Sequence, residues 1–119
     1  MYNIGFYTDQ RGKKPVREYI KALSASHDKQ SRKTLDKLHE YLDVLSKGGL
    51  SVGLPYIRHI EGEIWELRPA TERIFFVAWT GSQFILLHNF TKKTQKTPRN
   101  EIEIAKKRLK DLKERGQNG

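Results

Sequence analysis

The apolar positions in the first half of the chain follow one strand-like pattern and then two helix-like patterns. Residues 2–8 contain three strand-favouring side chains and lead into Asp-Gln-Arg-Gly, which predicts a strand and its end. A short helix is predicted from Pro15, because apolar side chains recur from Val16 at offsets of three, four and seven residues. A longer helix is predicted from about residue 28 to residue 47, where four leucines keep a 3-4-3 spacing before paired glycines. These two helices are expected to form a hairpin whose apolar stripes lie on a sheet.

The second half of the chain has the pattern of a loop followed by strands. Residues 50–62, with two glycines and a proline, are expected to form a loop. Three strands are predicted after it, at residues 63–69, 73–80 and 83–91. The last two are apolar on both faces, which is typical of central strands covered on both sides. Gly81-Ser82 predicts a type II′ turn between them, and residues 69–72 a four-residue hairpin loop.

A final helix completes the predicted fold. Thr97 is expected to cap it and Pro98 to be its first residue, while residues 116–119 are expected to fray. The order of elements predicts an α+β fold, an antiparallel sheet with an N-terminal helical hairpin and a C-terminal helix. A length of 119 residues is enough for one domain, residues 1–119.

Composition narrows the class of protein. The chain has no cysteine, which excludes disulfides, thiolate metal sites and a cysteine nucleophile. Its first residues lack the pattern of a signal peptide, and its longest apolar run, residues 74–79, is far shorter than the ~20 residues of a membrane span. We therefore expect a soluble cytoplasmic protein with no membrane contact. The net charge of +9 favours a polyanionic partner.

Basic residues gather in a window without acidic residues. No aspartate or glutamate occurs between Glu72 and Glu101. The window holds five basic residues and one histidine: Arg73, Lys92, Lys93, Lys96, Arg99 and His88. The segment Thr91–Pro98 brings three of these lysines next to a helix N-terminus, where backbone N–H groups also favour phosphate. The alternative is an ordinary solvated basic loop.

The predicted hairpins place several of these side chains on one face of the sheet. With Gly81-Ser82 as the turn, residue 73 lies opposite residue 90, and with residues 69–72 as the loop, Arg68 lies opposite Arg73. Five side chains are then expected on one face at one end of the sheet, with Glu66 one step further in: Arg68, Arg73, His88, Phe90 and Lys92. A single arginine would be expected to pair with Glu66 or Glu72. The convergence of several cations favours an anion site instead.

These residue types match the chemistry of RNA cleavage without a metal. A lysine whose pKa is lowered by neighbouring cations, or a histidine, can carry the proton, and arginines can stabilise charge on the phosphate. Phe90 and Tyr56 offer rings on which bases could stack, although Phe90 alone is better read as a core residue. The four histidines lack the spacing of a metal site, so neither a metal nor a cofactor is expected.

Four segments of the chain carry a resemblance to a known family. They are Leu54–Gly62, the Ile-Trp-Glu-Leu-Arg-Pro run at 64–69, Arg-Ile-Phe-Phe at 73–76, and Leu86–Pro98 with its Phe-Thr-Lys-Lys-Thr-Gln-Lys-Thr-Pro sequence. In this order they resemble the phage-derived branch of the RelE/HigB toxins of bacterial type II toxin–antitoxin systems. The resemblance covers about residues 2–113.

The resemblance implies a RelE-like fold and a ribosome-dependent endoribonuclease that cuts mRNA in the A site, using the 2′-OH of the RNA and no metal. Arg68 and Arg73 would bind the scissile phosphate, and either Lys92 or Lys93 would act as base or acid. His88 is a weak candidate for the acid of the leaving group, because the C-terminal tyrosine or histidine of some relatives has no match here. The candidate RNA-binding residues are Lys96, Arg99, Phe90, Tyr56 and Arg58.

The family also implies partners. A cognate antitoxin, often a helix-turn-helix protein, would block the toxin, and operator DNA would be bound only through their complex. Two other readings of the sequence stay open at this point. The same basic surface could serve a non-catalytic nucleic-acid-binding protein or co-repressor, or the charge could serve solubility alone.

Overall fold

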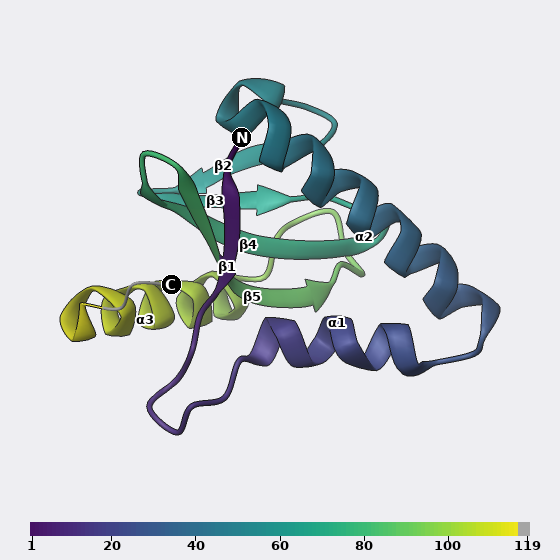
Figure 1. Ribbon diagram of the computed structural model, residues 1–119, viewed down its shortest axis with the longest axis horizontal. Helices are drawn as coiled ribbons and strands as arrows, with labels where there is room; N and C mark the ends of the chain where they lie inside the picture. The colour runs from purple at the N-terminus through teal and green to yellow at the C-terminus, as the bar shows by residue number, and fades with distance from the viewer. Residues whose placement is uncertain (117–119) are drawn as a thin grey trace.

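The computed structural model describes residues 1–116 and contains a twisted five-stranded sheet between two helical layers (Figure 1). In chain order its elements are β1 (Asn3–Phe6), α1 (Pro15–Ala25), α2 (Lys29–Gly48), the short 3-10 helix η1 (Gly49–Val52), β2 (Ile57–Glu61), β3 (Ile64–Leu67), β4 (Glu72–Thr80), β5 (Gln83–Thr91) and α3 (Arg99–Arg115). The predicted α+β fold, with its N-terminal helical hairpin and C-terminal helix, is confirmed.

The sheet is mixed rather than wholly antiparallel. Its strand order is β1-β5-β4-β3-β2, and β1 pairs in parallel with β5 while the other neighbours are antiparallel. The doubly apolar strands β4 and β5 are central, as their sequences predict. The expected loop at 50–62 is wrong in its second part, because residues 57–61 form the edge strand β2.

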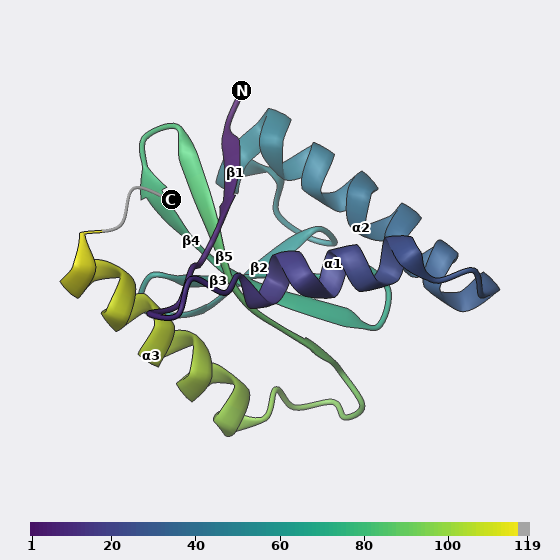
Figure 2. The same cartoon turned by 60° about the horizontal axis from the view of Figure 1, so that its bottom comes forward.

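The helices cover opposite faces of the sheet (Figures 1 and 2). The hairpin of α1 and α2 packs on one face through a core that includes Val16, Leu38 and Leu45. Helix α3 packs on the other face through a second core around Phe75 and Leu112. None of the helices within residues 1–116 has both the length and the apolar character needed to cross a membrane.

Two turn assignments made from the sequence are corrected. Gly81 does not adopt a positive φ, so the β4–β5 turn is not of type II′, although Thr80 does pair with Gln83 as expected. Helix α3 begins at Arg99 with Pro98 at its N-cap, and Thr97 does not cap it. The hydroxyl of Thr97 instead accepts a hydrogen bond from Arg58 Nη2 at 3.3 Å. The expected fraying at 117–119 lies outside the described residues.

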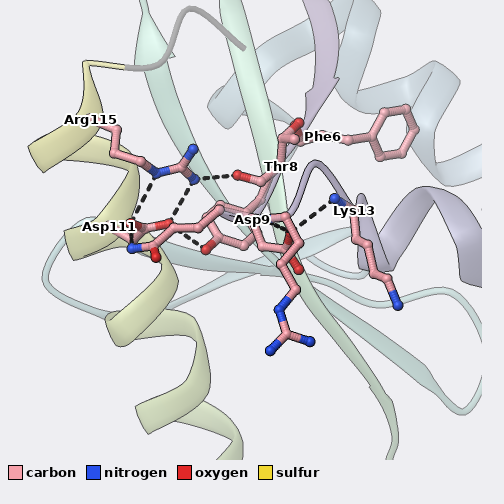
Figure 3. A network of polar contacts seen from close by, with 9 residues as sticks. Phe6, Thr8, Asp9, Lys13, Asp111 and Arg115 are labelled. Carbon is pink, nitrogen blue, oxygen red and sulfur yellow. Dashed lines mark hydrogen bonds and ion pairs between the residues drawn. The ribbon is translucent and has the colours of Figure 1, made fainter.

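A polar cluster fastens the C-terminal part of α3 to the start of the chain (Figure 3). The hydroxyl of Tyr7 donates to Asp111 at 2.5 Å, and Arg115 binds both Asp111 and the carbonyl of Thr8. Together, Arg115 and Tyr7 hold the pKa of Asp111 at about 2. Helix α3 is therefore fixed over the sheet face that carries the basic side chains.

Gly49 illustrates a backbone position that only glycine fits. It ends α2 with φ +62° and ψ −152°, and a Cβ at this position would lie 2.7 Å from the ring of Tyr2. Gly49→Ala should therefore lower the free energy of unfolding by about 1–3 kcal/mol in a urea titration. Gly81→Ala is the matched control, since nothing lies within 4 Å of its Cβ position. Equal stability of the two variants would contradict the strain at Gly49.

Candidate phosphate-binding site

Four neighbouring strands carry the basic side chains to one end of the sheet, on the face covered by α3. Arg58 of β2 pairs in register with Glu66 of β3, and Glu66 pairs with Phe75 of β4. Leu67 pairs with Ile74, so the next position brings Arg68 opposite Arg73. Arg73 in turn pairs with Phe90 of β5. The register expected from the sequence is thus observed at these positions, because two irregularities in the β4–β5 ladder compensate for each other.

A buried carboxylate lies under three arginines. Glu66 is 0% exposed, and its Oε1 lies 3.4 Å from Arg58, 3.9 Å from Arg68 and 3.9 Å from Arg73. Within the described part of the chain, neither carboxylate oxygen of Glu66 accepts a hydrogen bond. The arginines become more buried toward the sheet interior, with side chains 42%, 23% and 11% exposed in that order. We call Arg58, Glu66, Arg68 and Arg73 the arginine cluster.

Arg73 is held by the loop that joins β3 to β4. Its Nη1 donates to the carbonyls of Ala70 and Glu72 at 2.8 and 2.7 Å. Its Nε is buried and makes no hydrogen bond in the described residues. Burial lowers the pKa of Arg73, and the charges of Arg68 and Arg58 act in the same direction. The guanidinium is therefore fixed in place before any ligand arrives, which is the arrangement that favours binding of an oxyanion.

Lysines from the end of β5 complete an open basic depression. It has a volume of about 540 Å³ and is lined by Arg68, Ala70, Thr71, Arg73, Lys92, Lys93, Thr94 and Gln95. The backbone N–H of Lys92 donates to the Thr71 carbonyl at 2.8 Å, which joins the two loops that form its walls. A depression of this size can receive a nucleotide and its phosphates.

Lys92 is the lysine most affected by these surroundings. Burial is the main cause that lowers its pKa, and the charges of three arginines of the cluster act in the same direction. The charge of Glu66 opposes them. A lowered pKa increases the fraction of neutral amine near pH 7, and only the neutral amine can accept a proton.

The remaining basic candidates, Arg58, Lys96 and Arg99, do not line this depression. Arg58 connects the arginine cluster to the segment before α3 through its hydrogen bond to Thr97. Lys96 is exposed in that segment. Arg99 instead forms a bidentate pair with Glu61 at 2.7 and 3.1 Å. That pair holds the start of α3 against β2, and together with Lys106 it keeps the pKa of Glu61 at about 2.

The two aromatic candidates do not line the depression. Phe90 is only 8% exposed and packs edge-to-face on Phe75 under α3. Tyr56 belongs to the core on the opposite face, where its ring contacts Tyr41 of α2. Neither ring has an open face next to the arginine cluster, so we do not retain the stacking role considered from the sequence.

His88 shares the expected face but lies beneath α3. Its Nε2 is 2.7 Å from Glu101, its Nδ1 is 3.4 Å from Arg108, and its ring stacks on Phe90. Burial lowers its pKa, the hydrogen bond to Glu101 opposes this, and Arg108 adds to it. These contacts identify His88 as part of the packing of α3, and the geometry argues against its acting as the acid on a ligand in the depression.

The shifted pKa of His88 predicts a pH-dependent stability. The unfolded imidazole, with a pKa of about 6.5, takes up a proton before the folded one does. The free energy of unfolding should therefore fall as the pH drops below that value, and His88→Gln should remove this part of the fall. Urea titrations at two pH values, one on each side of 6.5, test this. The exposed His39 gives the control variant His39→Gln, and an unchanged pH dependence in His88→Gln would contradict the prediction.

The burial of Glu66 and the positions of Thr71, Thr94 and Gln95 in the lining of the depression were not predicted from the sequence. Glu66 was placed on the basic face, but its complete burial was not foreseen. The signal was its position between Trp65 and Leu67 in a strand that lies next to a central strand. The second acidic residue considered for pairing, Glu72, accepts hydrogen bonds from Tyr19 and Thr91 at its carboxylate, and within residues 1–116 it forms no ion pair with an arginine. Among residues 1–116, no group of three or more His, Asp or Glu side chains is arranged to hold a metal ion.

The family of the chain follows from comparison with known proteins. No curated protein shows a significant match to the sequence. A family model described as "Phage derived protein Gp49-like (DUF891)" matches residues 18–110, which include every member of the arginine cluster and both lysines of the depression. Since this match spans well over half of the chain, the protein belongs to the phage-derived Gp49-like family, a member of the toxin group of toxin–antitoxin systems within the RelE/HigB-like superfamily.

Proposed function

We propose that this protein is a toxin that cleaves mRNA in the ribosomal A site without a metal ion. The observation that carries the proposal is the convergence of Arg68, Arg73 and Lys92 on one depression, with Arg58 and the buried carboxylate of Glu66 beside these arginines. Such a site is suited to an anion with charge on several oxygens, as in a phosphodiester. Membership of the toxin group supports a target in an essential process of the cell.

The proposed reaction is an internal transesterification of RNA. The 2′-oxygen attacks the adjacent phosphorus while Lys92, as the neutral amine, takes the hydroxyl proton. The P–O5′ bond then breaks, and the ammonium of Lys93 gives a proton to the leaving oxygen. Arg68 and Arg73 face the developing charge on the pentacovalent phosphorus. The products are a 2′,3′-cyclic phosphate and a free 5′-hydroxyl.

A translation reaction with purified ribosomes tests this function. With the purified protein and a defined mRNA, we expect cleavage within the A-site codon and a cyclic phosphate on the upstream fragment. The same mRNA without ribosomes should remain intact. Intact mRNA on stalled ribosomes, at protein concentrations that saturate binding, would contradict the proposal.

A non-catalytic nucleic-acid-binding protein is the second candidate. It is favoured by one observation: the described lining of the depression includes neither a histidine nor a tyrosine that could serve as a conventional acid. This alternative predicts RNA binding that weakens steeply with salt, and no cleavage. Expression of the protein alone in a bacterial host separates the two, since only the nuclease should arrest growth with cut transcripts.

The toxin group implies an antitoxin. We propose that the antitoxin is encoded beside this chain, that it is a helix-turn-helix protein, and that it brings the toxin to operator DNA. Co-expression of the neighbouring small reading frame should restore the growth of cells that express the toxin. A neighbour that binds the protein without restoring growth would contradict an antitoxin role.

A further inference from the structure

Glu66 occupies an unfavourable position that packing alone does not explain. A fully buried carboxylate normally accepts hydrogen bonds, because removing its charge from water is costly. Here both oxygens lack a hydrogen bond within the described residues. Their neighbours are instead three guanidinium groups, which come from β2, from β4 and from the residue that follows β3.

The three arginines would repel one another without this carboxylate. The β3–β4 register, continued one residue beyond the Leu67–Ile74 pair, brings Arg68 opposite Arg73, and like charges in such a position are destabilising. Arg58 is 42% exposed and could turn into solvent. The negative charge beneath them attracts all three toward one point. Two backbone carbonyls also hold Arg73, so the carboxylate has its largest effect on where the N–H groups of Arg58 and Arg68 lie.

The ion pairs are also loose. Distances of 3.4–3.9 Å exceed the ~2.7–2.9 Å of a charge-assisted hydrogen bond. The arginine N–H groups are therefore not used up by Glu66, and an anion that enters the depression can accept hydrogen bonds from them. The same carboxylate must still weaken the binding of that anion, because two negative charges then face the same cations.

We propose that Glu66 is a positioning residue, a buried counter-anion that assembles Arg58, Arg68 and Arg73 for the phosphodiester at the cost of weaker anion binding. The cleavage part of this inference rests on the proposed function, whereas the arrangement of the arginines does not. Removal of the charge at Glu66 should strengthen anion binding and slow cleavage. A merely structural role for Glu66 would not produce these opposite effects.

Glu66→Gln tests this expectation because it keeps the shape of the side chain and removes its charge. The binding probe is a trinucleotide with 2′-deoxy sugars, which lacks the attacking 2′-hydroxyl and cannot be cut by this reaction. We expect Glu66→Gln to bind it about fivefold more tightly. Single-turnover cleavage on saturated ribosomes should be slower by about 10- to 100-fold, because the arginines lose their alignment.

Two further variants control for folding. Glu72→Gln neutralises the other buried carboxylate, which accepts hydrogen bonds from Tyr19 and Thr91 and forms no ion pair with an arginine among the described residues. Its charge acts on Arg73 only without direct contact, so this variant should change both measurements much less than Glu66→Gln does. Glu66→Asp keeps the charge, and it should retain the weaker anion binding of the parent protein with intermediate cleavage. If Glu66→Gln does not fold, Glu66→Asp still tests the inference, since tighter binding by Glu66→Asp would overturn it.

The outcomes separate this inference from the proposed function. Nitrogen-15 spectra report the arginine Nε–H groups directly. We expect the arginine signals of the parent protein to be dispersed, and those of Glu66→Gln to collapse into one overlapping group. If the parent protein does not cleave mRNA but this collapse and the tighter binding are observed, the nuclease proposal fails and the assembling role of Glu66 stands. Unchanged arginine signals together with unchanged anion binding in folded Glu66→Gln would overturn the inference.

Discussion

Replacing Arg73 with glutamine should slow ribosome-dependent mRNA cleavage by about 100- to 1,000-fold, the usual loss when one fixed donor to a developing oxyanion is removed. Arg73 is the most buried arginine of the cluster and the one whose position is fixed by two backbone carbonyls. The planar guanidinium of Arg73 presents several N–H donors in a fixed geometry, which neither a water molecule nor a flexible lysine can reproduce. Arg73→Lys should therefore recover only part of the rate.

Single-turnover cleavage on stalled ribosomes is the measurement, with far-UV circular dichroism as the check on folding. Arg32→Gln is the matched control, because it removes the same charge from an exposed position on α2. It should cleave like the parent protein. Undiminished cleavage by the double variant Arg68→Ala/Arg73→Ala would refute the role given to both arginines.

Replacing Phe75 with alanine should lower the free energy of unfolding by about 3–5 kcal/mol, the cost typical of removing a fully buried aromatic ring. Phe75 is 0% exposed at the centre of the core beneath α3, and its ring contacts Phe90 at a centroid distance of 5.2 Å. The cavity would lie directly beside Glu66, its register partner on β3. This variant should therefore lose anion binding together with stability.

Urea unfolding followed by tryptophan fluorescence measures this effect, with Trp65 and Trp79 as natural reporters on β3 and β4. Phe75→Leu retains most of the volume and should cost clearly less than Phe75→Ala. A loss below about 1 kcal/mol for Phe75→Ala would show that the core can collapse around the missing ring.

Local sequence patterns were sufficient where local physics decides the structure. Helix α2 was predictable because Asp28 caps it through Ser31 N–H and Leu38 and Leu45 are buried on one side. The β4–β5 hairpin was predictable because its short turn fixes the register of a long apolar pair. That register placed Arg73 opposite Phe90, and the short loop at 69–72 likewise placed Arg68 opposite Arg73.

The remaining features depend on distant partners. Strand β2 contains Arg58 and His59 and lies at an edge, so its sequence lacks the apolar signature of a covered strand. The parallel pairing of β1 with β5 joins residues about eighty positions apart, and no local pattern encodes it. The burial of Glu66 likewise depends on three side chains contributed by its neighbours in space.

The pairing of the first strand, β1, with the last strand, β5, has a consequence for how the protein is synthesised and folds. Asn3 pairs with Gln83, and Tyr7 is joined to Asp111 on the final helix. The sheet and its covering helix can therefore close only after the residues up to α3 have emerged from the ribosome, which makes folding depend on contacts distant in sequence. If the proposed activity holds, the growing chain carries no finished catalytic surface until α3 has been made, so a partly made chain cannot attack translation.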